Sequence, residues 1–257
     1  MPITTKTKKE IGILREGGKR LARVLARVSA EVRPGVSSRE LNDLAEKLIR
    51  EGGDIPSFLG YAPTGAKRVY PASICVSVND EVVHGIPNEG EKVLKEGDIV
   101  TLDGGLIHEG LFTDSAITVG VGKIDEGAQK LLETTQKALA VGVKAVFAGA
   151  TTGDVGFAIE SFVKPFDYGI VRELAGHGVG YAVHEEPFVP NFGKKGEGAV
   201  LKAGMVIAIE PMLNEGGAGV KLAKDGYTYI TKDGSRSAHF EHTVVVTENG
   251  ADILTNL

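Results

Sequence analysis

The chain contains an internal repeat, and this repeat limits its possible folds more than any other feature of the sequence. The segment VLKEGDIVTLD at residues 93–103 returns 107 positions later as VLKAGMVIAIE at residues 200–210. Upstream of these, PGVSSRELNDLAEKLI at residues 34–49 is echoed 114 positions later by AGATTGDVGFAIESFV at residues 148–163. Repeated segments in one order indicate a duplicated structural unit. We therefore expect an α+β fold of two pseudo-symmetric halves with a site between them.

Local patterns predict the same order of elements in each half. Apolar residues at helical spacing predict helices over residues 11–32 and 126–147. The serine pair at 37–38 and the threonine pair at 151–152 each precede an acidic residue, which is typical of a helix N-cap. Alternating runs after each of these helices predict strands. Each half therefore reads helix, helix, strands.

The chain is expected to form one domain. Residues 1–10 are polar, and we expect them to be a flexible, loosely held N-terminal segment. Residues 11–257 carry no linker-like composition, so we expect a single domain with internal halves at about 11–122 and 123–250.

Composition excludes several classes of protein. The chain has 29 basic and 34 acidic residues, and a net charge of −5 disfavours a nucleic-acid partner. A single cysteine indicates a reducing compartment. No apolar run approaches the roughly 18 residues of a membrane span, and the N-terminus lacks the apolar core of a secretory signal. We expect a soluble, cytoplasmic protein without a membrane partner.

Two aspartates lie on neighbouring predicted strands. Asp103 ends IVTLD and Asp114 lies in FTDSAIT, and a turn at residues 108–110 would place them nearly opposite one another. Like charges across a ladder are destabilising, and buried carboxylates are costly unless neutralised. A shared cation or a shared proton would remove this conflict. The alternative is a solvated hairpin with two exposed aspartates.

The repeat supports the cation. Asp103 matches Glu210, and Asp114 matches Glu241 in HFEHTVVV, so each half supplies two acids at equivalent places. Four carboxylates converging about a pseudo-twofold axis cannot all stay ionised without cations. Oxygen donors with one imidazole suit one or two divalent ions such as Mn, Fe, Co or Zn.

Three histidines occur in glycine-containing runs. His177 and His184 lie in GHGVGYAVHEEP, and His84 lies in VVHGIP, whose His-Gly-Ile matches His177-Gly-Val. Glycines at this density favour close approach of the backbone to a ligand. His177 is a candidate metal ligand, and His84 and His184 are candidates to hydrogen-bond a substrate carbonyl or leaving group. A lone histidine is more often structural. The remaining histidines receive no role: His108, His239 and His242.

These motifs resemble the type I methionine aminopeptidases, the shortest catalytic form of the pita-bread metallopeptidases. The resemblance covers about residues 11–247 and rests on VNDEVVHGIP, TLDGGLIHEGLFTDSA, GHGVGYAVHEEP, AIEPML and SAHFEHTVVVT. It implies a pita-bread fold around a central antiparallel sheet. It also implies a site for two divalent ions (Co, Mn, Fe or Zn), with ligands distributed as follows: Asp103 on one metal, Asp114 and Glu241 bridging, His177 and Glu210 on the other.

The activity that the resemblance implies is removal of the initiator methionine from nascent proteins whose second residue is small. Water activated by the metals would attack the methionine carbonyl, with His84 and His184 contacting the scissile peptide and Glu210 as the expected proton shuttle. The implied partners are nascent N-termini, contact with the ribosome is left open, and a monomer is expected. One alternative is a proline-specific peptidase of the same fold. Another is a non-catalytic peptide-binding protein.

The methionine pocket is where the sequence departs from the family. The residues expected to line it are Phe58, Tyr61, Tyr70, Cys75 and Tyr227. The stretch between Tyr61 and Tyr70 is longer than in compact bacterial members, and Tyr227 stands where a tryptophan is common. Phe58 and Tyr61 could instead be ordinary core residues. Cys75 is expected to be a pocket wall, because nothing nearby marks it as an activated nucleophile.

Overall fold

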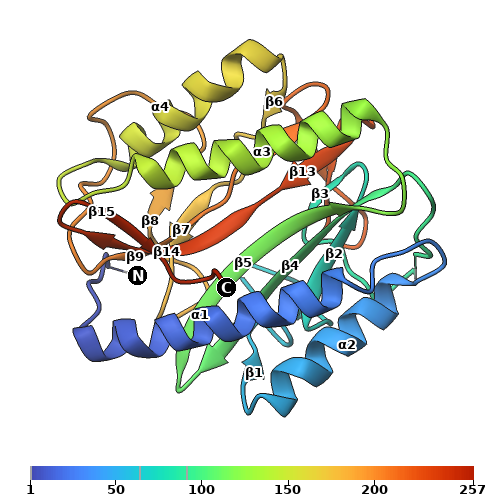
Figure 1. The fold of residues 1–257 in the computed structure, drawn as a ribbon, viewed down its shortest axis with the longest axis horizontal. Helices are drawn as coiled ribbons and strands as arrows, with labels where there is room; N and C mark the ends of the chain where they lie inside the picture. Colours follow the sequence, from blue (N-terminus) through green and yellow to red (C-terminus); the bar gives the residue numbers. More distant parts are fainter. Residues whose placement is uncertain (1, 64, 91) are drawn as a thin grey trace.

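The computed structural model describes residues 2–63, 65–90 and 92–257 (Figure 1). Met1 of the N-terminal segment, Thr64 of the stretch between Tyr61 and Tyr70, and Glu91 lie outside the described residues. Within the described ranges the helices are α1 (Lys8–Ser29), α2 (Ser38–Glu51), α3 (Glu126–Lys144), α4 (Thr152–Val163) and the 3₁₀ turn η1 (Lys164–Phe166). None of these helices is long and apolar enough to cross a membrane.

The strands follow the helices in each half. In chain order they are β1 (Ile55–Pro56), β2 (Ile74–Val78), β3 (Glu81–Val83), β4 (Ile99–His108), β5 (Leu111–Gly120), β6 (Gly169–Ile170), β7 (Gly176–Gly178), β8 (Glu185–Val189), β9 (Val206–Ile209), β10 (Met212–Asn214), β11 (Val220–Leu222), β12 (Tyr229–Thr231), β13 (Ser237–His239), β14 (Glu241–Thr247) and β15 (Gly250–Ile253).

One antiparallel sheet forms the centre of the molecule. Its strands run in the order β1-β4-β5-β14-β9-β7-β8, with β2 on β4 and β15 on β14, so β5 and β14 join the two halves. Figure 1 shows the four long helices on one face of this sheet, α1 and α2 over the first half and α3 and α4 over the second. Two apolar clusters fill the space beneath these helix pairs. The predicted α+β architecture of two halves around an antiparallel sheet is confirmed.

The helix starts repeat in detail. Ser37 caps α2 with Glu40, and Thr151 caps α4 with Asp154, and in each case both hydrogen bonds of a capping box are present. The first residue of each predicted pair, Ser37 or Thr151, is therefore the N-cap. The helix α1 begins at Lys8, three residues before its predicted start, because a third capping box forms at Thr7.

The entry to each capped helix is held by the same backbone contacts. The Gly35 N–H donates to the Leu94 carbonyl at 2.8 Å, and the Leu94 N–H donates to the Val36 carbonyl at 2.8 Å. In the second half, the Gly149 N–H donates to the Leu201 carbonyl at 2.9 Å, and the Leu201 N–H donates to Ala150 at 2.8 Å. These pairs are related by the shifts seen in the sequence, so the repeat is a repeat of structure.

The register of the β4–β5 hairpin differs from the expected one. The turn consists of Glu109 and Gly110, both with positive φ (46° and 83°), so His108 pairs with Leu111. Asp103 therefore lies opposite Ala116, and Asp114 lies opposite Gly105. The two aspartates are on the same face but offset along the strands, because the turn is centred one residue later than predicted.

Two further features were not expected from the sequence. In the segment before α1, Lys6 is buried and its N–H donates to the Gly204 carbonyl at 2.7 Å. The sequence match of His84 with His177 is not a structural equivalence. His177 lies within β7 of the large sheet, whereas His84 follows β3, which belongs to a small sheet with β11 and β12.

Candidate active site

Four adjacent strands bring the carboxylates to one face of the sheet. Asp103 on β4 and Glu241 on β14 are both opposite Ala116 of β5, so their side chains share its face. Asp114 lies two residues before Ala116 and points the same way. Continuing the pairing of His242 with Ile209 by one residue places Glu210 opposite Glu241. The four acids thus converge where the two halves meet.

Asp103, Asp114 and Glu241 are buried, and Glu210 keeps a side-chain exposure of 13%. Burial raises the pKa of Asp103 to about 7. Burial, and then the charge of Asp103, raise the pKa of Asp114 well above its usual value. The pKa values of Glu210 and Glu241 are also raised, first by burial and then by the neighbouring carboxylates. These shifts show that the cluster carries unfavourable charge that a cation would neutralise.

The donors fit a divalent cation. One ligand atom each from Asp114, His177 and Glu241 lie within 4.8 Å of one another. One buried oxygen of each of Asp103, Asp114 and Glu241 has no hydrogen-bond partner in the part of the chain that the structure describes. Oxygens left unpaired at this depth are costly, and a divalent ion with oxygen and imidazole ligands satisfies them.

His177 is held in the tautomer that a ligand requires. Its Nδ1 lies 2.9 Å from the Gly178 carbonyl, which can only accept, so Nδ1 carries the proton. The lone pair is then on Nε2, which lies 3.5 Å from an oxygen of Glu210. Burial lowers the pKa of His177 to about 3, so the imidazole is neutral. His177 can therefore offer Nε2 to the same ion as the carboxylates.

The other two predicted histidines flank this cluster. His184 lies in the loop between β7 and β8, with its ring centroid 4.4 Å from that of His177 and its Nδ1 2.8 Å from the Tyr61 hydroxyl. His84 follows β3 with a φ of +59°, a strained conformation for a residue other than glycine. Burial lowers the pKa of both rings, that of His84 to about 4, so both are neutral.

The remaining predicted residues form the apolar end of the same cavity, whose volume is about 150 Å³. The Tyr70 and Tyr227 rings meet edge to face at 5.2 Å, and both hydroxyls donate to backbone carbonyls, those of Gly85 and Arg68. Phe58 and Cys75 are buried beside them, and Tyr61 closes the cavity on its more exposed side. Burial raises the pKa of the Cys75 thiol well above its usual value, which favours a pocket wall over a nucleophile.

Every predicted site residue thus lines this cavity, and three residues without a predicted role line it as well: Pro63, Val83 and His239. His239 is buried, with Nε2 3.6 Å from a Glu210 oxygen, and neither ring nitrogen has a hydrogen-bond partner among the described residues. Its position two residues before Glu241 is not a reliable signal, because His239 lies on β13 and Glu241 on β14, and the two strands belong to different sheets.

The two other histidines lie away from the cavity. The His108 Nδ1 is 2.7 Å from an Asp54 oxygen, and the His242 Nδ1 is 3.0 Å from the Thr255 hydroxyl. Both contacts are structural, which agrees with the absence of an assigned role.

Comparison with known proteins identifies the family. The model of metallopeptidase family M24 matches residues 12–248. The methionine aminopeptidase of Aquifex aeolicus is 46% identical over 261 residues, covering 100% of both chains, and methionine aminopeptidase 1 of Bacillus subtilis is 44% identical over 255 residues, covering 99% of this chain and 100% of the relative.

Solved structures agree. The methionine aminopeptidase of Thermotoga maritima superposes with a TM-score of 0.95 at 41% identity, covering 100% of both chains. The Xaa-Pro dipeptidase of Bacillus anthracis reaches 0.78 at 25% identity and covers 98% of this chain but 62% of its own. The pita-bread fold is common to both, and the full-length likeness is to the former. The chain therefore belongs to metallopeptidase family M24, among its methionine aminopeptidases.

Proposed function

We propose that this chain hydrolyses the peptide bond after an N-terminal methionine, using two divalent ions held at the junction of its halves. The observation that carries the proposal is the meeting of the buried carboxylates and His177 with an apolar cavity of about 150 Å³. The full-length relatives named methionine aminopeptidase support this substrate over the proline peptides of the more distant dipeptidase.

Five side chains would hold the ions. Asp103 would ligate one ion, Asp114 and Glu241 would bridge, and His177 and Glu210 would ligate the other. When bound, the ions supply Lewis acidity that lowers the pKa of water towards neutrality and polarises the scissile carbonyl. The number and identity of the ions, among Co, Mn, Fe and Zn, are part of the proposal.

His184 is suited to stabilise the negative charge that develops on the carbonyl oxygen. If the Tyr61 hydroxyl donates to Nδ1 over their 2.8 Å contact, Nε2 of the neutral ring carries the proton. That N–H can donate to the carbonyl oxygen, and the hydrogen bond strengthens as charge accumulates there. His84 enters from β3 and would contact the amide nitrogen of the scissile bond.

Glu210 is the proposed proton shuttle. Its carboxylate lies at the junction of the acids and His177, and a carboxylate at this position can accept a proton from the attacking water. The proton would then pass to the leaving amine. The His177 and His239 rings lie beside this carboxyl, with Nε2 atoms 3.5 and 3.6 Å from its two oxygens.

The apolar end of the cavity would receive the methionine side chain. Phe58, Tyr70, Cys75 and Tyr227 offer aromatic and sulfur surface, against which a thioether packs favourably. The whole cavity holds only about 150 Å³, so we expect the second substrate residue to be small. We also propose nascent chains in the cytoplasm as substrates, and a monomeric single catalytic domain over residues 11–257. Contact with the ribosome remains a proposal.

The test is release of free methionine from Met-Ala-Ser, before and after chelation, with Mn, Co, Fe and Zn added back separately. An Ala-Pro peptide serves as the matched control. Chelator-sensitive cleavage of the methionine peptide alone is the expected result, and the add-back ranks the metals. Cleavage of the proline peptide alone would transfer the activity to the proline-specific class. Lack of cleavage with every metal would overturn the proposal.

A further inference from the structure

We propose that Lys6 and Glu185 are positioning residues for His184, so that the segment before the first helix forms part of the catalytic apparatus. The inference rests on the proposed function, because it assigns these residues to the action of His184. Two observations support it. One is a buried ion pair between Lys6 and Glu185, neither of which belongs to the carboxylate cluster, and the other is the loop before Glu185, which this pair contacts.

The ion pair is fully enclosed. The Lys6 Nζ lies 2.6 Å from an oxygen of Glu185, and both side chains are 1% exposed. The Thr4 hydroxyl donates to the same oxygen at 2.9 Å. The other oxygen of Glu185 accepts the backbone N–H groups of Tyr181 and Ala182. One carboxylate, at the start of β8, therefore ties the N-terminal segment to the middle of the loop that runs from β7 to β8.

Lys6 is itself fixed from the opposite side. Its N–H donates to the Gly204 carbonyl at 2.7 Å, and the Gly204 N–H donates to the Val246 carbonyl of β14 at 2.9 Å. Its stem packs against Gly180, where a Cβ would lie 2.4 Å from the lysine Cε, and its ammonium lies over the Tyr181 ring. Lys6 thus connects β14, through Gly204, to the loop between β7 and β8.

The loop carries His184, which directly precedes Glu185. Among the described residues, the His184 imidazole makes one hydrogen-bond contact, to the hydroxyl of Tyr61, a partly exposed residue that lines the cavity. The placement of its backbone therefore depends on Glu185 at the start of β8. Removing the lysine leaves a buried carboxylate without its counter-charge, and such a group either moves towards water or takes up a proton. Either response shifts the peptide that orients His184.

A general loss of stability is the competing explanation, and a double-mutant cycle separates the two. Lys6→Met is expected to lower kcat about 10- to 100-fold, with KM for Met-Ala-Ser and bound metal within about twofold, because small misplacements of catalytic groups have effects of this size. In a His184→Ala background, the same Lys6→Met change should cause no further loss. Lys9→Met, at an exposed lysine in the first turn of α1, is the matched control and should behave as the unmodified protein.

Two further variants guard against misfolding. Glu185→Gln retains an oxygen for the Tyr181 and Ala182 N–H groups, and Lys6→Met/Glu185→Gln removes both charges together. The positioning role would be overturned if Lys6→Met lowered kcat equally in the unmodified protein and in the His184→Ala variant. Loss of bound metal together with kcat would overturn it as well. If Lys6→Met does not fold, the cycle is run with Glu185→Gln under the same criteria. Full activity in His184→Ala alone would instead contradict the proposed role of His184, and the positioning role with it.

Discussion

The first half of the chain joins its two central strands through a two-residue turn, whereas the second half places four additional strands between the equivalent pair. In the first half β4 leads directly into β5 at Glu109 and Gly110. In the second half β10, β11, β12 and β13 lie between β9 and β14. This inserted segment between β9 and β14 contributes Tyr227 and His239 to the cavity. The shared strands therefore present the acids, and the added segment builds one wall of the pocket.

The halves also differ in how their acids face one another. Asp103 and Asp114 are offset along β4 and β5, whereas Glu210 and Glu241 are directly opposite when the β9–β14 register is extended by one residue. The second pair has side chains one methylene longer. Because register and side-chain length differ, the carboxylates of the two halves reach the junction by different amounts, and the two proposed ions would have unlike surroundings.

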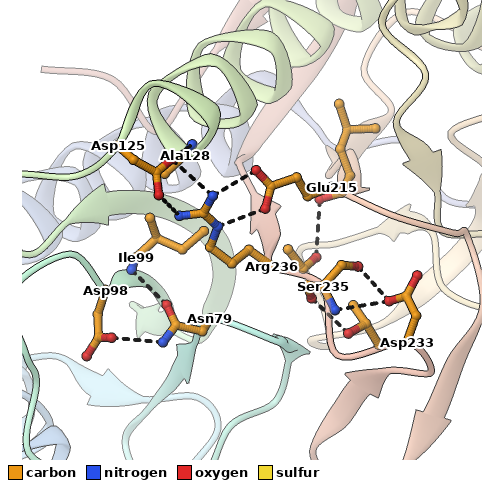
Figure 2. A network of polar contacts seen from close by, with 12 residues as sticks. Asn79, Asp98, Ile99, Asp125, Ala128, Glu215, Asp233, Ser235 and Arg236 are labelled. Atoms are coloured by element: carbon orange, nitrogen blue, oxygen red, sulfur yellow. Dashed lines mark hydrogen bonds and ion pairs between the residues drawn. The ribbon is translucent and has the colours of Figure 1, made fainter.

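Arg236 anchors the inserted segment between β9 and β14 to the N-terminus of α3. Figure 2 shows the Arg236 guanidinium between the carboxylates of Asp125 and Glu215, with contacts of 2.7 Å and 2.8 Å. Hydrogen bonds from Arg236 and from the backbone N–H of Ala128 lower the pKa of Asp125 to about 2. Asp125 is also the N-cap of α3. The segment that shapes the pocket is thus held by the helix of its own half.

The largest expected effect comes from removing an acid of either half at the junction. Asp114→Ala and Glu241→Ala should each lose metal and activity together. Changes to groups that only orient a ligand cost about 10- to 100-fold in affinity, and a direct ligand should exceed this. Metal content by atomic spectroscopy and methionine release measure the outcome. Glu248→Ala, at an exposed acid beyond β14, is the control. Retained activity in either variant would remove the bridging assignment.

The acids of both halves should also make metal-dependent stability sensitive to pH. The folded pKa of Asp103, about 7, exceeds the ordinary carboxyl value of about 4. The folded state therefore holds a proton that the unfolded state releases, and the metal-free protein loses stability as pH rises through this window. Added Mn should raise Tm more near pH 8 than near pH 5, because protons compete with the ion. A Tm gain independent of pH would contradict this account.

His184 should affect turnover without affecting metal, unlike the acids. His184→Ala is expected to lower kcat by about 10²- to 10³-fold, the range for removing one donor to a developing oxyanion. Metal content should stay that of the unmodified protein. Loss of metal in the variant would make His184 a ligand instead. His108→Ala, at a histidine outside the cavity, provides a comparison for the loss of an imidazole alone.

The smallest expected effect concerns the pocket wall added by the second half. Tyr227→Phe keeps the ring against Tyr70 but removes the hydroxyl that donates to the Arg68 carbonyl. A hydrogen bond of this kind contributes about 1 kcal/mol to folding stability, so Tm should fall slightly, and KM for a methionine peptide should rise by no more than about fivefold with kcat unchanged. A matching fall in kcat would mean that the wall also acts on the reacting bond.

Much of the site was predictable because its determinants are local. Asp103, Asp114 and Glu241 each lie in an alternating strand pattern, which predicts the face of the sheet on which the side chain lies. The repeat then relates the aspartates of the first half to the glutamates of the second. His239 was missed because the chain bends at Phe240 between β13 and β14, so no single strand pattern joins it to Glu241. The offset of Asp103 from Asp114 depends on the conformation of two turn residues.

The burial of Lys6 could not be predicted for a different physical reason. Lys6 appears in a polar run, and its partner Glu185 lies 179 positions away. Burial of such a lysine is decided by pairing in the folded chain, which no local pattern reports.

The junction of β5 with β14 has a consequence for how the protein is made. Asp114 and Glu241 meet across it, and the synthesis of the chain separates them by more than a hundred residues. Contacts this distant in sequence form late and slowly. A ribosome-bound chain that ends before Glu241 carries four of the five proposed ligands but lacks the strand β14 that closes the site. An enzyme proposed to act on emerging N-termini would therefore be inactive for most of its own synthesis, and would gain its site when the last long strand docks.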